Sequence, residues 1–116
     1  MNALNRDLKK LVNFIEKNEK ERVNKDYWRL KFHLMPPVGW LNDPNGLCEF
    51  NGEYHIFYQY SPFDANGGIK LWGHYTSKDF INYKNNGTEI FADQPFDCHG
   101  AYSGSTIVHN GKMNIF

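Results

Sequence analysis

The sequence predicts an all-β fold that follows one amphipathic helix, and more narrowly the beginning of a β-propeller. Residues 3–22 place apolar side chains at helical spacing, whereas from residue 27 short β-type runs alternate with Gly, Asn, Pro and Asp. A seven-residue hairpin pattern also occurs twice. We therefore expect a helical extension over residues 1–26 and, over residues 27–116, the first blade and the start of the second blade of a propeller domain.

The expected helix carries one apolar stripe, formed by Leu4, Leu8, Leu11, Val12 and Ile15. Arg, Lys and Asp lie between these positions, and three Glu residues follow Ile15 within the expected helix. Because the acidic residues interrupt the basic face, we expect the stripe to dock on the body of the protein and not on a membrane. No chemistry is expected of this helix.

The strongest strand signal is a hairpin. Leu47–Phe50 and Glu53–Tyr60 are β-type runs joined by Asn51-Gly52, the dipeptide that suits a type I′ turn. A third strand is expected over Leu71–Ser77. A weaker fourth strand is expected over either Phe80–Lys84 or Glu89–Phe91.

The hairpin pattern recurs 59 residues later, where Asn110–Phe116 lines up with Asn51–Phe57. Three or four strands per repeat at that spacing are typical of a propeller blade, although two unrelated Asn-Gly hairpins would give the same pattern. The second copy ends at Phe116 within an apolar run. Since a propeller needs about four or more blades to close, we expect the chain to be the N-terminal piece of a longer protein.

Composition excludes several classes. Thirteen basic residues balance 13 acidic ones, so neither nucleic acid nor an acidic membrane surface is an expected partner. Cys48 and Cys98 form no disulfide framework, and no Cys or His spacing indicates a metal site or another cofactor. No secretion signal is evident, so we expect a cytoplasmic protein. An aromatic content of 16% is typical of a β-rich core or a sugar-binding surface.

One carboxylate stands out in the segment Trp40-Leu41-Asn42-Asp43-Pro44-Asn45-Gly46. Pro44 fixes φ, and Asn45 and Gly46 tolerate tight-turn geometry, so we expect a turn that holds Asp43 on stiff backbone at its mouth. A nucleophilic or charge-stabilising carboxylate needs a fixed orientation of this kind. The alternative is an Asx turn in which Asp43 only caps its own backbone.

Four segments in order carry a resemblance to a known family: His33–Gly46, Phe57–Pro62, Trp72–Asp79 and His99–Ser105. Together they span about residues 32–105. This set closely resembles the signatures of glycoside hydrolase family 32, the family of invertases, sucrose-6-phosphate hydrolases and fructan hydrolases.

The resemblance implies a five-bladed β-propeller with its active site in an axial funnel. It implies that Asp43 is the nucleophile of a retaining hydrolysis of β-fructofuranosides, with hydrogen bonds from Asn42 favouring the charged carboxylate. The substrate-binding residues that it implies are Trp40, Leu41, Asn42, Gln59, Trp72, Tyr102 and Ser103. Trp72 is equally well explained as a residue of the blade core.

Other acidic residues stand beside Gly, Pro, Ser or Asn, so we expect turn and cap roles for Asp64, Asp79, Asp93 and Asp97. Two positions depart from the family pattern. Asn66-Gly67-Gly68 stands where many members carry a tryptophan in the sugar pocket, which leaves substrate preference open, and Tyr83 replaces a second tryptophan. The family's second aspartate and its acid/base glutamate would follow Phe116, so we expect this segment alone to lack measurable activity.

Three functions remain open at this stage. The leading one is hydrolysis of sucrose-6-phosphate or sucrose, with the sugar as the only partner, and a hydrolase of free sucrose or short fructans is its variant. The alternative from another class is a non-catalytic carbohydrate-binding propeller module or an inactive fragment.

Overall fold

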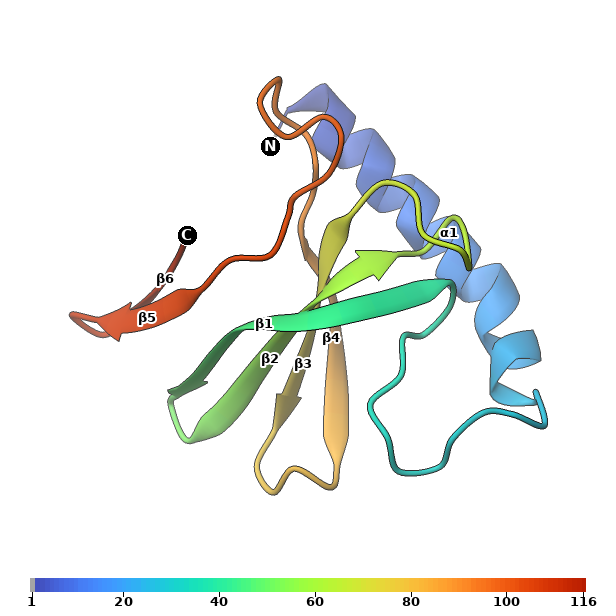
Figure 1. Ribbon diagram of the computed structural model, residues 1–116, viewed down its shortest axis with the longest axis horizontal. Coiled ribbons are helices and arrows are strands. Elements are labelled where there is room, and N and C mark those ends of the chain that lie inside the picture. The colour runs from blue at the N-terminus through green and yellow to red at the C-terminus, as the bar shows by residue number, and fades with distance from the viewer. Residues whose placement is uncertain (1) are drawn as a thin grey trace.

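The computed structural model describes residues 2–116 and places one helix beside two antiparallel sheets (Figure 1). The elements in chain order are α1 (Ala3–Asn24), β1 (Trp40–Phe50), β2 (Glu53–Ser61), β3 (Leu71–Ser77), β4 (Tyr83–Ile90), β5 (Thr106–His109) and β6 (Lys112–Ile115). Strands β1 to β4 form one sheet in sequence order, and β5 pairs with β6. The all-strand architecture with an N-terminal helix is therefore confirmed.

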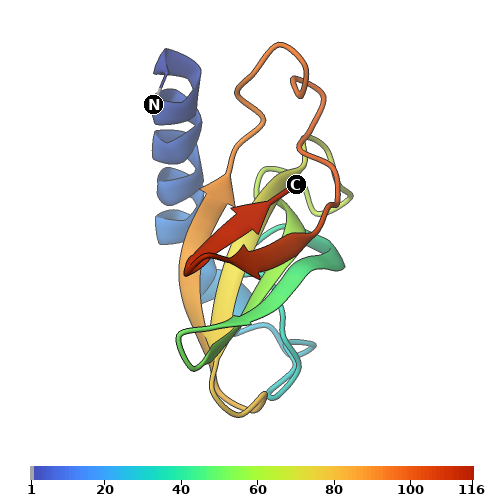
Figure 2. The same ribbon diagram turned by 90° about the vertical axis from the view of Figure 1, so that its left-hand side faces the viewer.

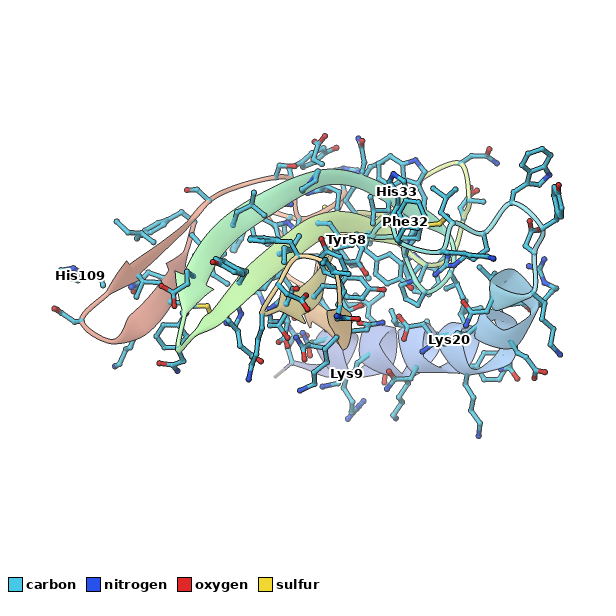
Figure 3. The ribbon with its side chains drawn as sticks, turned by 90° about the horizontal axis from the view of Figure 1, so that it is seen from below. Lys9, Lys20, Phe32, His33, Tyr58 and His109 are labelled. Carbon is cyan, nitrogen blue, oxygen red and sulfur yellow. The ribbon has the colours of Figure 1, made fainter. Side chains whose placement is uncertain are left out.

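Helix α1 runs two residues beyond the predicted end. The Asn2 side chain caps it by accepting from the Asn5 amide at 2.8 Å. Its buried residues, Leu8 and Val12, pack against the sheet, whereas Lys9 and Lys20 are exposed; Figure 3 shows α1 lying along one face of the sheet. Within residues 2–116, no helix has the length and apolar content needed to cross a membrane.

The β1–β4 sheet is buried on both faces at its centre. Tyr58 and Tyr60 pack with Leu8 and Val12 in the core beneath α1 (Figure 3). Phe57 and Trp72 point to the opposite face and pack with Ala101. Because each face has its own cover, β3 is buried at every position and β2 is buried over its last six residues.

The second hairpin covers that opposite face. In Figure 1 the β1–β4 sheet lies between α1 and the β5–β6 hairpin, and Figure 2 shows this hairpin in front of the sheet. Both hairpin turns have positive φ at their two central residues, 53° and 76° at Asn51-Gly52 and 50° and 69° at Asn110-Gly111. These values are those of type I′ turns. The two predicted Asn-Gly hairpins are confirmed.

Two sequence predictions need correction. The turn predicted at Pro44-Asn45-Gly46 is wrong, because β1 continues through these residues with two irregularities in its pairing to β2. The fourth strand coincides with neither predicted segment. It spans Tyr83–Ile90 and takes in Asn86-Gly87, with shifts in its pairing to β3 that absorb the extra residues.

Candidate functional site

Asp43 is the extra residue of a β-bulge. In the pairing of β1 with β2, Asn42 lies opposite Gln59 and Pro44 lies opposite Tyr58, so Asp43 has no partner. A bulge re-aims a side chain relative to the regular alternation of the strand. A bulge, and not the predicted turn, therefore sets the position of Asp43.

The carboxylate of Asp43 is exposed and meets a segment 60 residues later in the chain. The Ser103 hydroxyl donates to Oδ2 of Asp43 at 3.1 Å. The Asx-turn alternative is not what the structure shows, because within residues 2–116 the carboxylate accepts no hydrogen bond from its own neighbouring backbone. The fold thus joins two residues that the sequence had nominated separately.

The loop that carries Ser103 is held by buried side chains of β2 and β3. The Ala101 carbonyl accepts from Nε2 of Gln59 at 2.9 Å and from Nε1 of Trp72 at 3.0 Å. The indole also donates to the Tyr102 carbonyl at 3.1 Å. From the other side, the Ala101 amide donates to the carbonyl of Lys70 at 2.8 Å. Hydrogen bonds from the sheet therefore hold Ala101 and Tyr102, the two residues that precede Ser103.

This arrangement separates the nominated residues into groups. Gln59 and Trp72 are each 3% exposed, and both support the loop from the core. Leu41 packs on the core beneath α1. Asn42 and Ser103 are exposed beside Asp43, and Tyr102 is 69% exposed.

Trp40 is half-buried at the start of β1, and the ammonium of Lys70 lies 5.3 Å from the centre of its ring. This distance is that of a cation–π contact. Sequence reasoning did not single out Lys70. The sequence offered no reason to select this lysine, which precedes the Trp72-Gly73-His74 segment by two residues. Its contact with Trp40 results from the pairing of strands that are distant in the sequence.

Sequence reasoning also missed Asn45, which is 6% exposed. Its amide donates to the Asp43 carbonyl at 3.2 Å, while its Oδ1 is buried with no partner among the described residues. The Oε1 atom of Gln59 is in the same state. Asn45 lies two residues after Asp43, and Gln59 pairs with the residue before it. Buried acceptors without a partner are rare in native proteins, and a catalytic or binding role is one explanation for them.

Asp64, Asp79 and Asp97 stabilise turns by accepting hydrogen bonds from nearby backbone amides, as predicted. Asp64 and Asp97 accept from backbone amides two and three residues away. Asp79 accepts from the Asn82 amide and side chain and from the Ile81 amide, and these bonds lower the pKa of its carboxyl. Asp93 differs, because it anchors the start of α1 through Asn2 and Asn5.

Two histidines meet in the sheet away from Asp43. Nδ1 of His55 lies 2.9 Å from Nε2 of His74, and the ring of His74 stacks on Phe57. Burial, followed by the neighbouring His55, lowers the pKa of His74. No cluster of three or more His, Cys, Asp or Glu side chains in residues 2–116 is arranged to hold a metal ion.

Comparisons with known proteins agree with one another. The family model described as the N-terminal domain of glycosyl hydrolases family 32 matches residues 33–116. A sucrose-6-phosphate hydrolase of Bacillus subtilis is 40% identical over 117 residues, which cover 100% of this chain and 24% of that protein. One of Vibrio alginolyticus is 49% identical over 85 residues, covering 73% of this chain and 18% of that protein.

A solved structure shows the same fold. Sucrose-6-phosphate hydrolase from Lactobacillus gasseri superposes with a TM-score of 0.83 at 37% identity, covering 89% of this chain and 21% of that one. A variant of a Bombyx mori family 32 β-fructofuranosidase, in complex with sucrose, gives 0.82 at 30% identity over 94% of this chain and 22% of that one. The chain thus spans 18% and 24% of the two curated relatives described above.

Proposed function

The chain belongs to glycoside hydrolase family 32, and on this premise we propose that it is the N-terminal part of a β-fructofuranosidase that hydrolyses sucrose-6-phosphate or sucrose, with Asp43 as the nucleophile. The names of the similar proteins, which are glycoside hydrolases, support the reaction class. The observation that carries the role of Asp43 is the contact between its exposed, bulge-held carboxylate and the Ser103 hydroxyl.

In this mechanism the Asp43 carboxylate attacks the anomeric carbon of the fructosyl unit. The bond from that carbon to the bridging oxygen breaks, and a fructosyl–enzyme ester forms. Water then attacks the same carbon, releases fructose and returns the carboxylate. The Ser103 hydrogen bond orients one carboxylate oxygen, which leaves the other oxygen to form the ester.

A second carboxyl group must protonate the leaving sugar and later activate the water. We propose that it comes from the part of the relatives' length that this chain does not span. The proposal includes a five-bladed propeller in which β1 and β5 are inner strands of adjacent blades. Its support is that β5 lies beside β1, where the Gly46 amide donates to the Gly104 carbonyl at 3.4 Å.

We further propose that residues 1–26 act as a structural extension and residues 27–116 as the propeller portion. The exposed Asn42 and Ser103 then contact the fructosyl hydroxyls, and Trp40 forms a wall of the substrate pocket further along β1. Gln59 and Trp72 contribute by holding the Ser103 loop. A cytoplasmic location would fit a phosphorylated substrate that sugar import delivers.

The test replaces Asp43 by asparagine in the longer protein. Asp43→Asn is nearly isosteric but cannot attack as an anion, so kcat on sucrose and sucrose-6-phosphate should fall by about three or more orders of magnitude. Asp64→Asn is the matched control, because Asp64 is an exposed turn residue. It should retain the parental kcat.

The same experiment addresses the alternative of a non-catalytic carbohydrate-binding module. If the parental protein binds sucrose in calorimetry but releases no fructose, the module is favoured over the enzyme. Hydrolysis by Asp43→Asn at near-parental rate would remove Asp43 from the nucleophile's role.

A further inference from the structure

Lys70 lies on the same face of the sheet as the candidate site. It precedes Leu71, which pairs with Tyr60, and Tyr60 in turn pairs with Leu41. Lys70 therefore lies one residue before this cross-strand row, level with the neighbouring pair of Ser61 and Trp40. By the alternation of a strand, its side chain shares the face of Trp72. The 5.3 Å contact of its ammonium with the Trp40 ring agrees with this placement.

The backbone of Lys70 is tied directly to the loop that bears Ser103. Its carbonyl accepts from the Ala101 amide at 2.8 Å, and Lys70 forms a parallel bridge with Gly100. Two residues further along, Ser103 holds the Asp43 carboxylate. A chain of contacts thus joins Lys70 to the proposed nucleophile both through the loop and through strand β1.

The charge of Lys70 has no counter-ion in the part of the chain that the structure describes. No carboxylate of residues 2–116 lies within ion-pair distance of its ammonium. One of its three donors goes to the Gly68 carbonyl at 2.8 Å. Because an ammonium carries three N–H groups, two remain for a ligand.

The ammonium is also left accessible by the loop that precedes it. A Cβ at Gly67 would lie 3.8 Å from Nζ of Lys70, so a larger side chain there would sit against the charge. Gly67 has a φ of 113°, a conformation that L side chains rarely adopt. Two successive glycines therefore keep the space beside Lys70 free of side chains.

The spacing suits a disaccharide that carries a charged group at one end. Trp40 and Asp43 are three residues apart on β1, which is about 8 Å along the strand because the bulge places Asp43 within a single step of β2. If the fructosyl carbon is at Asp43, the second sugar extends away from it. A group on the primary hydroxyl of that sugar can then reach the ammonium held over Trp40.

We propose that Lys70 is a specificity-determining residue that binds the phosphate of sucrose-6-phosphate. The inference rests on the proposed function, which leaves the choice between phosphorylated and free sucrose open. A compact, strongly hydrated ammonium suits a phosphate, and its contact with Trp40 holds the long side chain in place without neutralising it. Free sucrose offers no anion at this position.

The test measures kcat/KM of the longer protein for sucrose-6-phosphate and for sucrose, and takes their ratio as the preference. Lys70→Gln keeps a donor for the Gly68 carbonyl but removes the charge. It should lower the preference about 10- to 100-fold, as expected for one charge-assisted hydrogen bond. Lys70→Arg should retain most of the preference. The matched control is Lys78→Gln, an exposed residue just beyond the opposite end of β3, which should leave the ratio unchanged.

An equal fall in kcat/KM for both sugars in Lys70→Gln would overturn the proposal, because it would indicate a structural role for Lys70. An unchanged ratio, or a parental enzyme that prefers free sucrose, would overturn it as well. If neither sugar is hydrolysed, the proposed function fails, and calorimetry with sucrose-6-phosphate decides the inference separately. Binding that Lys70→Gln weakens at least tenfold, with Lys78→Gln unaffected, would support it, and equal binding by the two variants would refute it.

Discussion

Replacing Trp72 by phenylalanine separates two roles for this residue, which sequence reasoning left undecided. The indole N–H donates to the carbonyls of Ala101 and Tyr102, at 3.0 and 3.1 Å. In Trp72→Phe the Ala101 carbonyl keeps its bond from Gln59, whereas the Tyr102 carbonyl loses its donor among the described residues. The lost hydrogen bond costs about 1 kcal/mol, and the smaller ring leaves a gap worth about 1 kcal/mol more. We therefore expect a loss of about 2 kcal/mol in stability.

The kinetic consequence follows from the position of Ser103. If Trp72 holds the loop, its loss lets Ser103 move relative to Asp43, and a displacement of about 1 Å lowers kcat by about 10- to 100-fold. KM should change little, because the 3% exposed indole offers the sugar almost no surface. The assay combines thermal unfolding of the longer protein with steady-state hydrolysis. Trp28→Phe is the control, since Trp28 is 80% exposed.

The result that refutes this reasoning is specific. A higher KM with unchanged kcat and stability would show that Trp72 contacts the sugar, as the family resemblance implied. Parental values of all three quantities would show that the loop does not depend on the indole hydrogen bonds.

Two further predictions concern single contacts. Ser103→Ala removes the hydroxyl that donates to Asp43 and should lower kcat about tenfold. The exposed Ser105→Ala should not lower it, and equal rates for the two variants would contradict the proposed contact. Burial raises the pKa of Glu16, which accepts from the Tyr60 hydroxyl. Because the pKa of Glu16 is higher in the folded protein than its value of 4.5 in the unfolded chain, protonation of Glu16 stabilises the fold. This contribution is fully present below pH 4.5 and is lost as the pH rises through the folded pKa. Glu16→Gln keeps the acceptor, so thermal melts should show a larger gain over the parental protein at pH 7 than at pH 4; equal gains would contradict the assigned cause.

The elements that sequence reasoning located well are those with local causes. Helix α1 follows from the spacing of Leu8 and Val12, and strand β3 was predicted with its observed bounds. The two hairpins follow from Asn-Gly turns, whose residues tolerate positive φ. Hydrophobic periodicity and turn preferences depend on a few neighbouring residues, so they can be recognised in the sequence without knowledge of tertiary contacts.

The errors arose where pairing between strands overrides a local preference. Pro44-Asn45-Gly46 has the composition of a turn, yet β2 pairs with β1 on both sides of it, and bulges absorb the extra residues. The same holds for β4, where Asn86-Gly87 lies inside the strand and not at a break. Hydrogen bonding with an adjacent strand outweighs the preference of a few residues for a turn, and short-range sequence patterns do not identify the adjacent strand.

By itself, the sequence determined the fold class, the order of the hairpins and the chemical identity of the candidate carboxylate, since each depends on residue type and short spacing. Only the tertiary structure decided that Ser103 reaches Asp43, that Gln59 and Trp72 support the loop, and that Lys70 lies over Trp40. These contacts join residues 29 to 60 positions apart. They arise because strand register and two β1 bulges set which side chains share a face, and that register follows from the packing of the whole sheet between α1 and the second hairpin.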